Sequence, residues 1–389
     1  MYTLGIESTA HTFGVGIAEN DRVIANERDT LKPLSGGIIP REAAAHHFRL
    51  AAEILGKALN KSGLRLKDID LFAFSQGPGI IPALKVGAGL SAFLSKKYGK
   101  KLIGVNHCVA HLEIARLYTG LQDPVMLYVS GGNTQIITYY NKNYIVFGET
   151  QDIGIGNLLD KTGRRMGIPF PAGPEIEKLA EKGKHYIEMP YSIKGMDVSF
   201  SGIETFVSKI MGRETKEDIA FSLQETVFSM LIEASERTMA YCLKNSLVIT
   251  GGVAANKRLN EMGRKMCSER AAEFKEIPME FAGDNGAMIA YTGYLMRDYN
   301  QKDLDIKPIT PKSLTVLSRF ILSETTWKLQ YLSILFFDII MSLCSRRSLF
   351  LSGSCKAINC TCTSFTLTIP YRIFSTFVRL NTFKTPSKL

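Results

Sequence analysis

The feature that most constrains the fold is a pattern of three short apolar runs that occurs twice in the chain. Residues 2–30 contain the runs TLGI, FGVGIA and RVIAN, which are separated by the turn-rich segments STAHT and ENDR. After Pro124 the same order recurs as VMLYVS, GGNT, QIITYY, NKN and YIVFGET. Short apolar runs bounded by turn residues are typical of antiparallel strands. The sequence therefore predicts two three-stranded meanders, one at the start of each half of the chain.

Helices and further strands are expected after each meander. The first half continues with a helix from Pro40 to Gly63, a strand at 71–76, a helix at 81–98, a strand at 101–107 and a helix through Leu117. The second continues with helices at 157–166 and 174–183, a looser stretch through FSGIETF, a helix at 217–244, the strand SLVIT, a helix from Lys257 and a last helix from Asp284 to Asp298. This order predicts an α/β protein. Two similar halves that each open with a meander describe the duplicated actin-like ATPase (ASKHA) fold, which has two lobes and a nucleotide in the central cleft.

Composition changes along the chain predict its domains. We expect an N-terminal lobe at 1–120, a C-terminal lobe at 121–283, a closing helix and linker at 284–311 and an atypical tail at 312–389. The tail has no clear hydrophobic period, so it is expected to be poorly ordered, either as an appendage or as an out-of-frame continuation of the gene. Its apolar run at 329–343 is shorter than the roughly 20 residues that cross a membrane, so no membrane segment is expected.

Charge and cysteine content favour a cytoplasmic protein without settling its partner. The net charge is +10, but nine Lys/Arg and two acids lie from Thr315 onward, so the rest of the chain is only mildly basic. Nucleic-acid binding cannot rest on so small an excess. The seven cysteines are odd in number and irregularly spaced, which favours a reduced compartment, and the start MYTLGIESTA resembles no secretion signal.

Two histidines are the sharpest local feature. His107 and His111 are four residues apart at a strand-to-helix junction, so on a helix they project from one face and can share a metal. Asp284, in FAGDNGAM, is the best third ligand, and Tyr128 could complete the site. Each has a simpler alternative: the histidines could bond only to neighbours, Asp284 could be a helix cap, and Tyr128 could be a packing residue.

Two glycine-rich loops fit a nucleotide. Ser130-Gly131-Gly132 follows a strand and could bind a phosphate through backbone N–H groups, although GGNT is also typical of a tight hairpin turn. ITGGVAAN at 249–256 follows a buried-type strand, and its glycines could face an adenine while Asn256 supplies an amide. Between the loops lie Asp160 and Gly173 with Glu177, and the two carboxylates could accept from ribose hydroxyls or could simply face solvent.

Many stretches together resemble one family. GIESTAHTFGVGI, GVNHCVAHLEIAR, LYVSGGNTQ, GIGNLLDKTGR, PAGPEIEKLAEKG, ITGGVAANKRLNEM and AGDNGAMIAYTG are similar to the tRNA N6-adenosine threonylcarbamoyltransferase family, in the family's order and over about residues 2–300. AHT after GIEST, together with NHCVAH, resembles the archaeal and eukaryotic branch, the catalytic subunit of the KEOPS complex, rather than bacterial TsaD.

The resemblance implies a chemistry and a set of site residues. Threonylcarbamoyl-AMP would donate its acyl group to N6 of adenosine 37 in tRNAs reading codons that start with A. Implied partners are tRNA, a small atypical protein kinase and small accessory subunits. The implied ligands of one metal ion, iron or zinc, are His107, His111, Tyr128 and Asp284, of which the two histidines and Asp284 would be catalytic. The implied contacts to ATP, AMP or the acyl-adenylate are Tyr128, Val129, Ser130, Gly131, Gly132, Asp160, Gly173, Glu177 and Asn256.

Two rival functions remain to be weighed. A metallopeptidase with paired histidines of the HExxH type carries a general-base Glu after the first His, but here that residue is Cys108. A nucleotide-gated, non-catalytic assembly subunit would have no use for an open metal site. Both rivals are therefore less well supported than the transferase.

Overall fold

The computed structural model describes residues 1–33, 37–140, 143–298, 359–362 and 365–368. The chain divides into two compact units, Met1–Ile321 and Leu322–Leu389. In the second unit the described residues form one antiparallel pair, β13 (Asn359–Cys362) with β14 (Phe365–Thr368). The expected linker beyond residue 298 and most of the expected tail lie outside the described residues.

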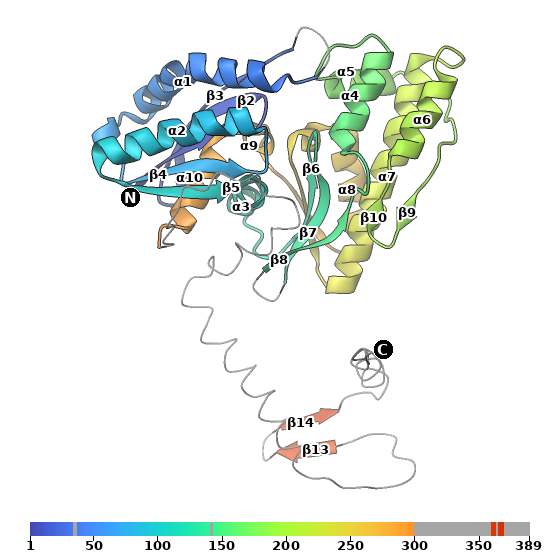
Figure 1. The fold of residues 1–389 in the computed structure, drawn as a ribbon. Helices are drawn as coiled ribbons and strands as arrows, with labels where there is room; N and C mark the ends of the chain where they lie inside the picture. The colour runs from blue at the N-terminus through green and yellow to red at the C-terminus, as the bar shows by residue number, and fades with distance from the viewer. Residues whose placement is uncertain (34–36, 141–142, 299–358, 363–364, 369–389) are drawn as a thin grey trace, which may run out of the picture. The chain divides into compact units, whose positions relative to one another are not determined.

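The first sheet contains the first predicted meander. Its strand order is β3-β2-β1-β4-β5, formed by β1 (Tyr2–Glu7), β2 (Thr12–Glu19), β3 (Arg22–Thr30), β4 (Leu71–Gly77) and β5 (Lys101–Asn106). The meander strands are antiparallel, whereas β4 and β5 run parallel to β1. The short helix η1 (Leu66–Asp68) precedes β4. Helices α1 (Pro40–Ser62) and α2 (Ile81–Tyr98) lie side by side over this sheet (Figure 1).

The second sheet repeats this topology. Its order is β12-β11-β6-β7-β8, formed by β6 (Val125–Val129), β7 (Thr134–Tyr140), β8 (Asn143–Glu149), β11 (Ser246–Thr250) and β12 (Glu273–Glu276). Again the meander β6-β7-β8 is antiparallel and the two later strands are parallel to its first strand. Both meanders predicted from the sequence are confirmed, and the shared order shows that the two halves are structural duplicates.

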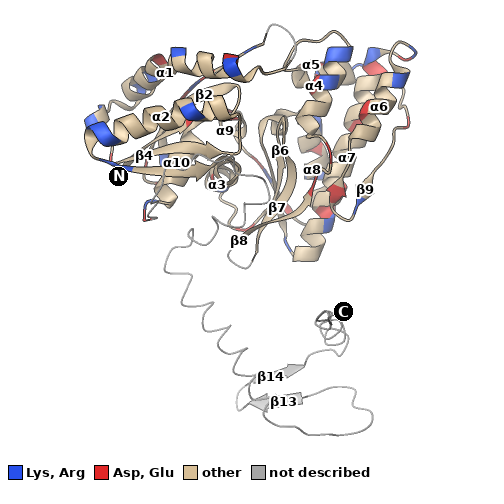
Figure 2. Ribbon diagram, in the orientation of Figure 1, with Lys and Arg blue, Asp and Glu red and all other residues tan. Residues whose placement is uncertain are grey.

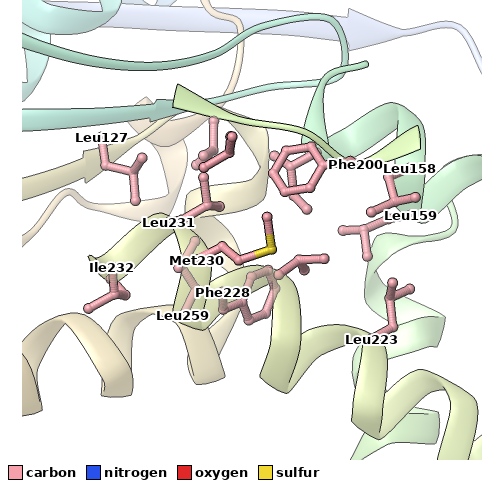
Figure 3. Close-up of a cluster of buried hydrophobic side chains, with 14 of the residues drawn as sticks. Leu127, Leu158, Leu159, Phe200, Leu223, Phe228, Met230, Leu231, Ile232 and Leu259 are labelled. Carbon is pink, nitrogen blue, oxygen red and sulfur yellow. The ribbon is translucent and has the colours of Figure 1, made fainter. Parts of the chain in front are cut away.

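Helices cover the second sheet around the largest core. They include α4 (Ile155–Arg165), α5 (Gly173–Ala180), α7 (Lys216–Cys242) and α8 (Lys257–Glu269), and the hairpin β9 (Ile193–Lys194) with β10 (Asp197–Val198) lies beside them. Figure 3 shows part of this core, where Phe228 and Leu231 of α7 meet Leu127 of β6 and Leu158 of α4. Lys and Arg residues lie on the outer helices, whereas β6 and β7 carry almost no charged residues (Figure 2).

The prediction of an irregular stretch through FSGIETF is wrong, because Ser201–Ile210 forms helix α6. Ile203 and Val207 are four residues apart and are both buried, so tertiary packing stabilises one apolar face. The first turn also receives a distant cap, since Asp152 accepts from the backbone N–H groups of Phe200 and Ser201, each at 2.9 Å. A cap supplied from 48 residues away leaves no local signal.

Helix α3 (His107–Thr119) joins the two halves. One side of it, including Ala110 and Ile114, packs with the core of the first sheet. The other side, including Cys108 and Leu112, packs with Tyr128 and further residues of the second meander. Among the described residues, the remaining helices are η2 (Gly252–Ala255), α9 (Met279–Ala282) and α10 (Gly286–Leu295).

Within the described part of the chain, no helix combines the length and apolar character needed to span a bilayer.

Candidate metal and nucleotide site

Helix α3 begins at His107, the last residue of the strand predicted at 101–107, so both histidines lie on the helix. Asn106 caps the helix, because its Oδ1 accepts from Cys108 N at 2.9 Å and from Val109 N at 3.2 Å. His107 and His111 therefore lie one turn apart on one face, with ring centroids 4.7 Å apart. The Oδ1 of Asp284 lies 3.2 Å from His111 Nε2 and 3.5 Å from His107 Nε2. Ligand atoms of all three residues lie within 4.8 Å of one another.

Asp284 reaches the histidines from a loop and does not cap a helix. Helix α10 begins at Gly286, and its cap is Asn285, whose side chain accepts from Met288 N at 2.9 Å. The expected helix start at Asp284 is therefore two residues early, and the alternative of a capping Asp284 is wrong. With Asn285 serving the helix, the Asp284 carboxylate faces the two imidazoles.

Strand β3 holds the Asp284 loop in place. Arg28 donates from one guanidinium nitrogen to the carbonyl oxygens of Glu280 at 3.0 Å and Asp284 at 3.1 Å. Asn26 adds a bond from its Oδ1, which accepts from Ala287 N at 3.3 Å. Neither residue is predictable from the sequence, because an exposed Arg on an edge strand gives no sign of a partner more than 250 residues away.

Tyr128, the penultimate residue of β6, lies beside the histidines. Its ring centroid lies 5.2 Å from that of His111, and the side chain is fully buried. Among the residues that the structure describes, its hydroxyl makes no hydrogen bond. An unpaired buried hydroxyl is costly, which is a reason to expect a further partner at this point. Burial, the Cys108 thiol and the Asp284 carboxylate together raise the pKa of Tyr128 well above its ordinary value.

The electrostatics of the cluster favour a cation. Burial alone would lower the pKa of His107, but the carboxylates of Glu7 and Asp284 raise it to about 9. Burial lowers the pKa of His111, whereas the two histidines hold the pKa of Asp284 far below its usual range despite burial. Glu7 is not among the residues predicted from the sequence, although an acid at the end of the otherwise apolar strand YTLGIE is a signal that identifies it.

The Ser130–Gly132 loop is a tight turn packed against the start of α4. Ser130 N donates to Asn133 O at 2.8 Å, and the backbone of Gly131 and Gly132 is exposed. Gly156 N donates to Ser130 O at 3.2 Å, and a Cβ on Gly156 would lie 2.7 Å from the Gly131 Cα. Glycine is thus required at position 156, because a side chain there would prevent the start of α4 from packing against the loop. The loop that follows β11 leaves the sheet at the same edge as the Ser130–Gly132 loop, because β11 is parallel to β6 and its last residue, Thr250, pairs with Tyr128.

The other predicted nucleotide residues form two pairs. Asp160 Oδ1 accepts from Ala172 N at 2.8 Å, which places it next to Gly173, and burial raises the pKa of Asp160. Glu177 Oε1 accepts from Lys257 N at 2.8 Å, next to Asn256. Asn256 caps α8 through Leu259 N and donates to Gln224 Oε1 at 2.6 Å. Gln224 is a further residue of this group that is not predicted from the sequence.

Similar proteins share one description. A family model described as tRNA N6-adenosine threonylcarbamoyltransferase, TsaD, matches residues 21–291. The protein named tRNA N6-adenosine threonylcarbamoyltransferase from Thermococcus gammatolerans is 54% identical over 298 residues, which cover 76% of this chain and 91% of the relative. A protein of Methanothermobacter thermautotrophicus, named probable bifunctional tRNA threonylcarbamoyladenosine biosynthesis protein, is 49% identical over 78% of this chain and 57% of its own length.

Solved structures agree on the fold. A crystal structure of HypF from T. kodakarensis matches with a TM-score of 0.55 and 15% identity, over 79% of this chain and 49% of that chain. This chain therefore spans about half of the HypF chain, and at such low identity the likeness shows the fold alone. With the duplicated topology, it confirms the predicted actin-like ATPase fold. On the family model and the archaeal relative, the chain belongs to the tRNA N6-adenosine threonylcarbamoyltransferase family.

Proposed function

We propose that this transferase works with one divalent metal ion, iron or zinc, held by His107, His111 and Asp284, with the Tyr128 hydroxyl as a fourth ligand. The observation that carries this proposal is the convergence of three ligand atoms within 4.8 Å. Two imidazoles and one carboxylate form a donor set typical of catalytic metal sites, and the unpaired Tyr128 hydroxyl fits the same group. A metal bound there would supply a Lewis acid for phosphate or carbonyl oxygens.

The acyl donor is proposed to be threonylcarbamoyl-AMP, made by a separate enzyme. The backbone of Ser130–Gly132 would bind its phosphate, and the two pairs of residues around Asp160 and Glu177 would surround its ribose and base. Because β6 and β11 are parallel neighbours, the glycine loops that follow them start at one edge of the sheet, which supports this placement. It is also supported by the exposed backbone of Gly131 and Gly132.

The chain attaches a threonylcarbamoyl group to N6 of an adenosine in tRNA. We place that adenosine at position 37 of tRNAs reading codons that start with A. The adenine amine is a poor nucleophile, so the mixed anhydride of the donor supplies the driving force and no covalent enzyme intermediate is needed. Burial raises the pKa of Cys108, the thiol next to His107, to about 12, so it stays protonated and does not act as a nucleophile.

The partners are proposed from the resemblance to the KEOPS catalytic subunit. A small atypical protein kinase and small accessory subunits would assemble with the chain in a KEOPS-type complex in the cytoplasm. The name of the Methanothermobacter relative, which is described as bifunctional, supports a second activity working beside this one. The lobe boundaries near residues 120 and 283 remain part of this proposal.

The test is to remove and restore the metal. Purified protein is treated with a chelator and assayed for transfer of labelled threonylcarbamoyl from its adenylate to tRNA, before and after addition of zinc or ferrous iron. We expect transfer to be lost with the metal and recovered with one equivalent of metal per chain. Full transfer by protein shown to contain no metal would reject the metal proposal and leave the family assignment intact.

A further inference from the structure

A buried glutamate lies directly behind one of the two histidines. Glu7, the last residue of β1, has a fully buried side chain, and its Oε2 lies 3.0 Å from His107 Nδ1. Its Oε1 accepts from Thr9 N at 2.7 Å and from Thr9 Oγ1 at 2.5 Å. Both oxygens of the carboxylate are therefore engaged, as burial of a charge requires.

The sheet brings these residues together. Strands β1, β4 and β5 are parallel, and His107 directly follows β5. The carboxyl ends of parallel strands meet at one edge of a sheet, so the last residue of β1 lies beside the first residue of α3. Thr9, in the turn after β1, then fixes the direction of the Glu7 side chain through its backbone and hydroxyl groups.

We propose that Glu7 is a positioning residue for the metal site, an inference that rests on the proposed metal function. Glu7 accepts a hydrogen bond from the Nδ1–H of His107, which keeps a proton on that nitrogen and directs Nε2, the proposed ligand atom, toward Asp284, 3.5 Å away. Carboxylates that accept from a ligating imidazole orient the ring and make its other nitrogen a stronger donor. Glu7 thus increases metal affinity without touching the metal.

His111 provides a built-in contrast. Its Nε2 is 3.2 Å from the same Asp284 oxygen, but its Nδ1 is buried and, in the described part of the chain, has no hydrogen-bond partner. Only His107 of the pair has a carboxylate behind it. His107 is accordingly the ligand whose orientation is fixed by a carboxylate before metal binds, and removal of Glu7 leaves its Nδ1 only the longer contact with Thr9 Oγ1, at 3.4 Å.

The experiment measures zinc affinity by competition with a chromogenic chelator. We expect Glu7→Gln to bind zinc about 10- to 100-fold more weakly than the parent protein, the usual effect of losing such a partner. Glu7→Asp keeps the charge but is one methylene shorter, so it also loses reach to His107 and should weaken binding. Glu19→Gln is the matched control, since Glu19 lies on the neighbouring strand, bonded to Arg22 at the surface, and should leave zinc affinity unchanged.

A spectroscopic readout separates positioning from loss of stability. In cobalt-loaded protein, Glu7→Gln should change the visible absorption of the ion, because the ligand field at His107 changes, whereas a merely destabilised protein keeps its spectrum. A zinc affinity within twofold of the parent in Glu7→Gln, or in Glu7→Asp if the first variant does not fold, overturns the inference. If His111→Ala also keeps parental zinc affinity, the metal proposal itself fails; if only the Glu7 variants do, the Glu7 inference alone fails.

Discussion

At the scale of single residues, two neighbours in the loop before α10 have separate tasks. Asp284 faces the histidines, and Asn285 caps the helix. We expect Asp284→Asn to lose most bound metal and most transfer, because a neutral amide is a much weaker ligand for a divalent cation than a carboxylate. Without metal the variant should lose only the charge interaction between Asp284 and His107, since the helix cap supplied by Asn285 remains.

Asn285→Ala is the matched control for that substitution. It should lower the free energy of unfolding by about 0.5–2 kcal/mol, the usual cost of a lost cap, while the folded protein keeps its metal. Metal analysis and chemical denaturation of both variants give the comparison. Full metal content and full transfer in Asp284→Asn would contradict the assignment of Asp284 as a ligand.

His107 predicts a pH dependence of stability in protein stripped of metal by a chelator. Its folded-state pKa is about 9, above the ordinary 6.5, because the Glu7 and Asp284 carboxylates outweigh burial. The stabilisation is therefore complete below pH 6.5 and is lost as the pH rises through 9, on the order of 3 kcal/mol in all. Denaturant titrations across this window should show the decline, and His107→Gln should flatten it. An equally steep decline in His107→Gln would show that other groups cause it.

The sequence predicts some of these residues and not others. The spacing of His107 and His111 fixes their common face once a helix is assumed, so they were predictable from local pattern. Glu7 and Arg28 were not, because their partners are 100 and 256 residues away and only the assembled sheet brings them close. Local spacing thus predicts ligands on one element, while residues that hold those ligands come from other elements.

At the scale of elements, α10 lies against the first meander through glycines. A Cβ on Gly16 of β2 would lie 2.2 Å from Ala287 N, and one on Gly286 would lie 2.1 Å from Gly16 N. Strand glycines often mark such close approach of another backbone. Glycines on β2 and at the start of α10 therefore allow the two backbones to approach closely, and this contact positions the Asp284 loop.

Gly16→Ala tests this contact. The added methyl group has no space against the α10 backbone, so we expect α10 to shift and the protein to lose about 2 kcal/mol or more of stability together with metal affinity. Gly56→Ala is the control, because Gly56 lies within α1 with nothing within 4 Å of its added Cβ. That change should stabilise the protein by up to about 1 kcal/mol. Equal effects of the two substitutions, measured by denaturation, would argue against glycine-dependent docking of α10.

At the scale of the whole molecule, the duplication was predictable and the junction was not. Two meanders with the same order predict two similar halves, because strand patterns are local. The double role of α3 follows only from the assembled structure, in which one side of it packs on each half of the molecule. A helix that carries the histidines and is shared by both cores makes the metal site sensitive to how the halves pack.

The last prediction concerns residues 312–389, whose composition lacks a core-forming period. All proposed ligands lie between His107 and Asp284, and the contacts that hold them come from residues such as Glu7 and Arg28. A chain ended near residue 312 should therefore keep the zinc and nucleotide affinities of the full chain, because a segment without a core-forming hydrophobic period contributes little to a packed core. Calorimetric titration of both forms with zinc and with AMP measures this. Loss of either affinity on truncation would show that the removed segment is an integral part of the catalytic unit.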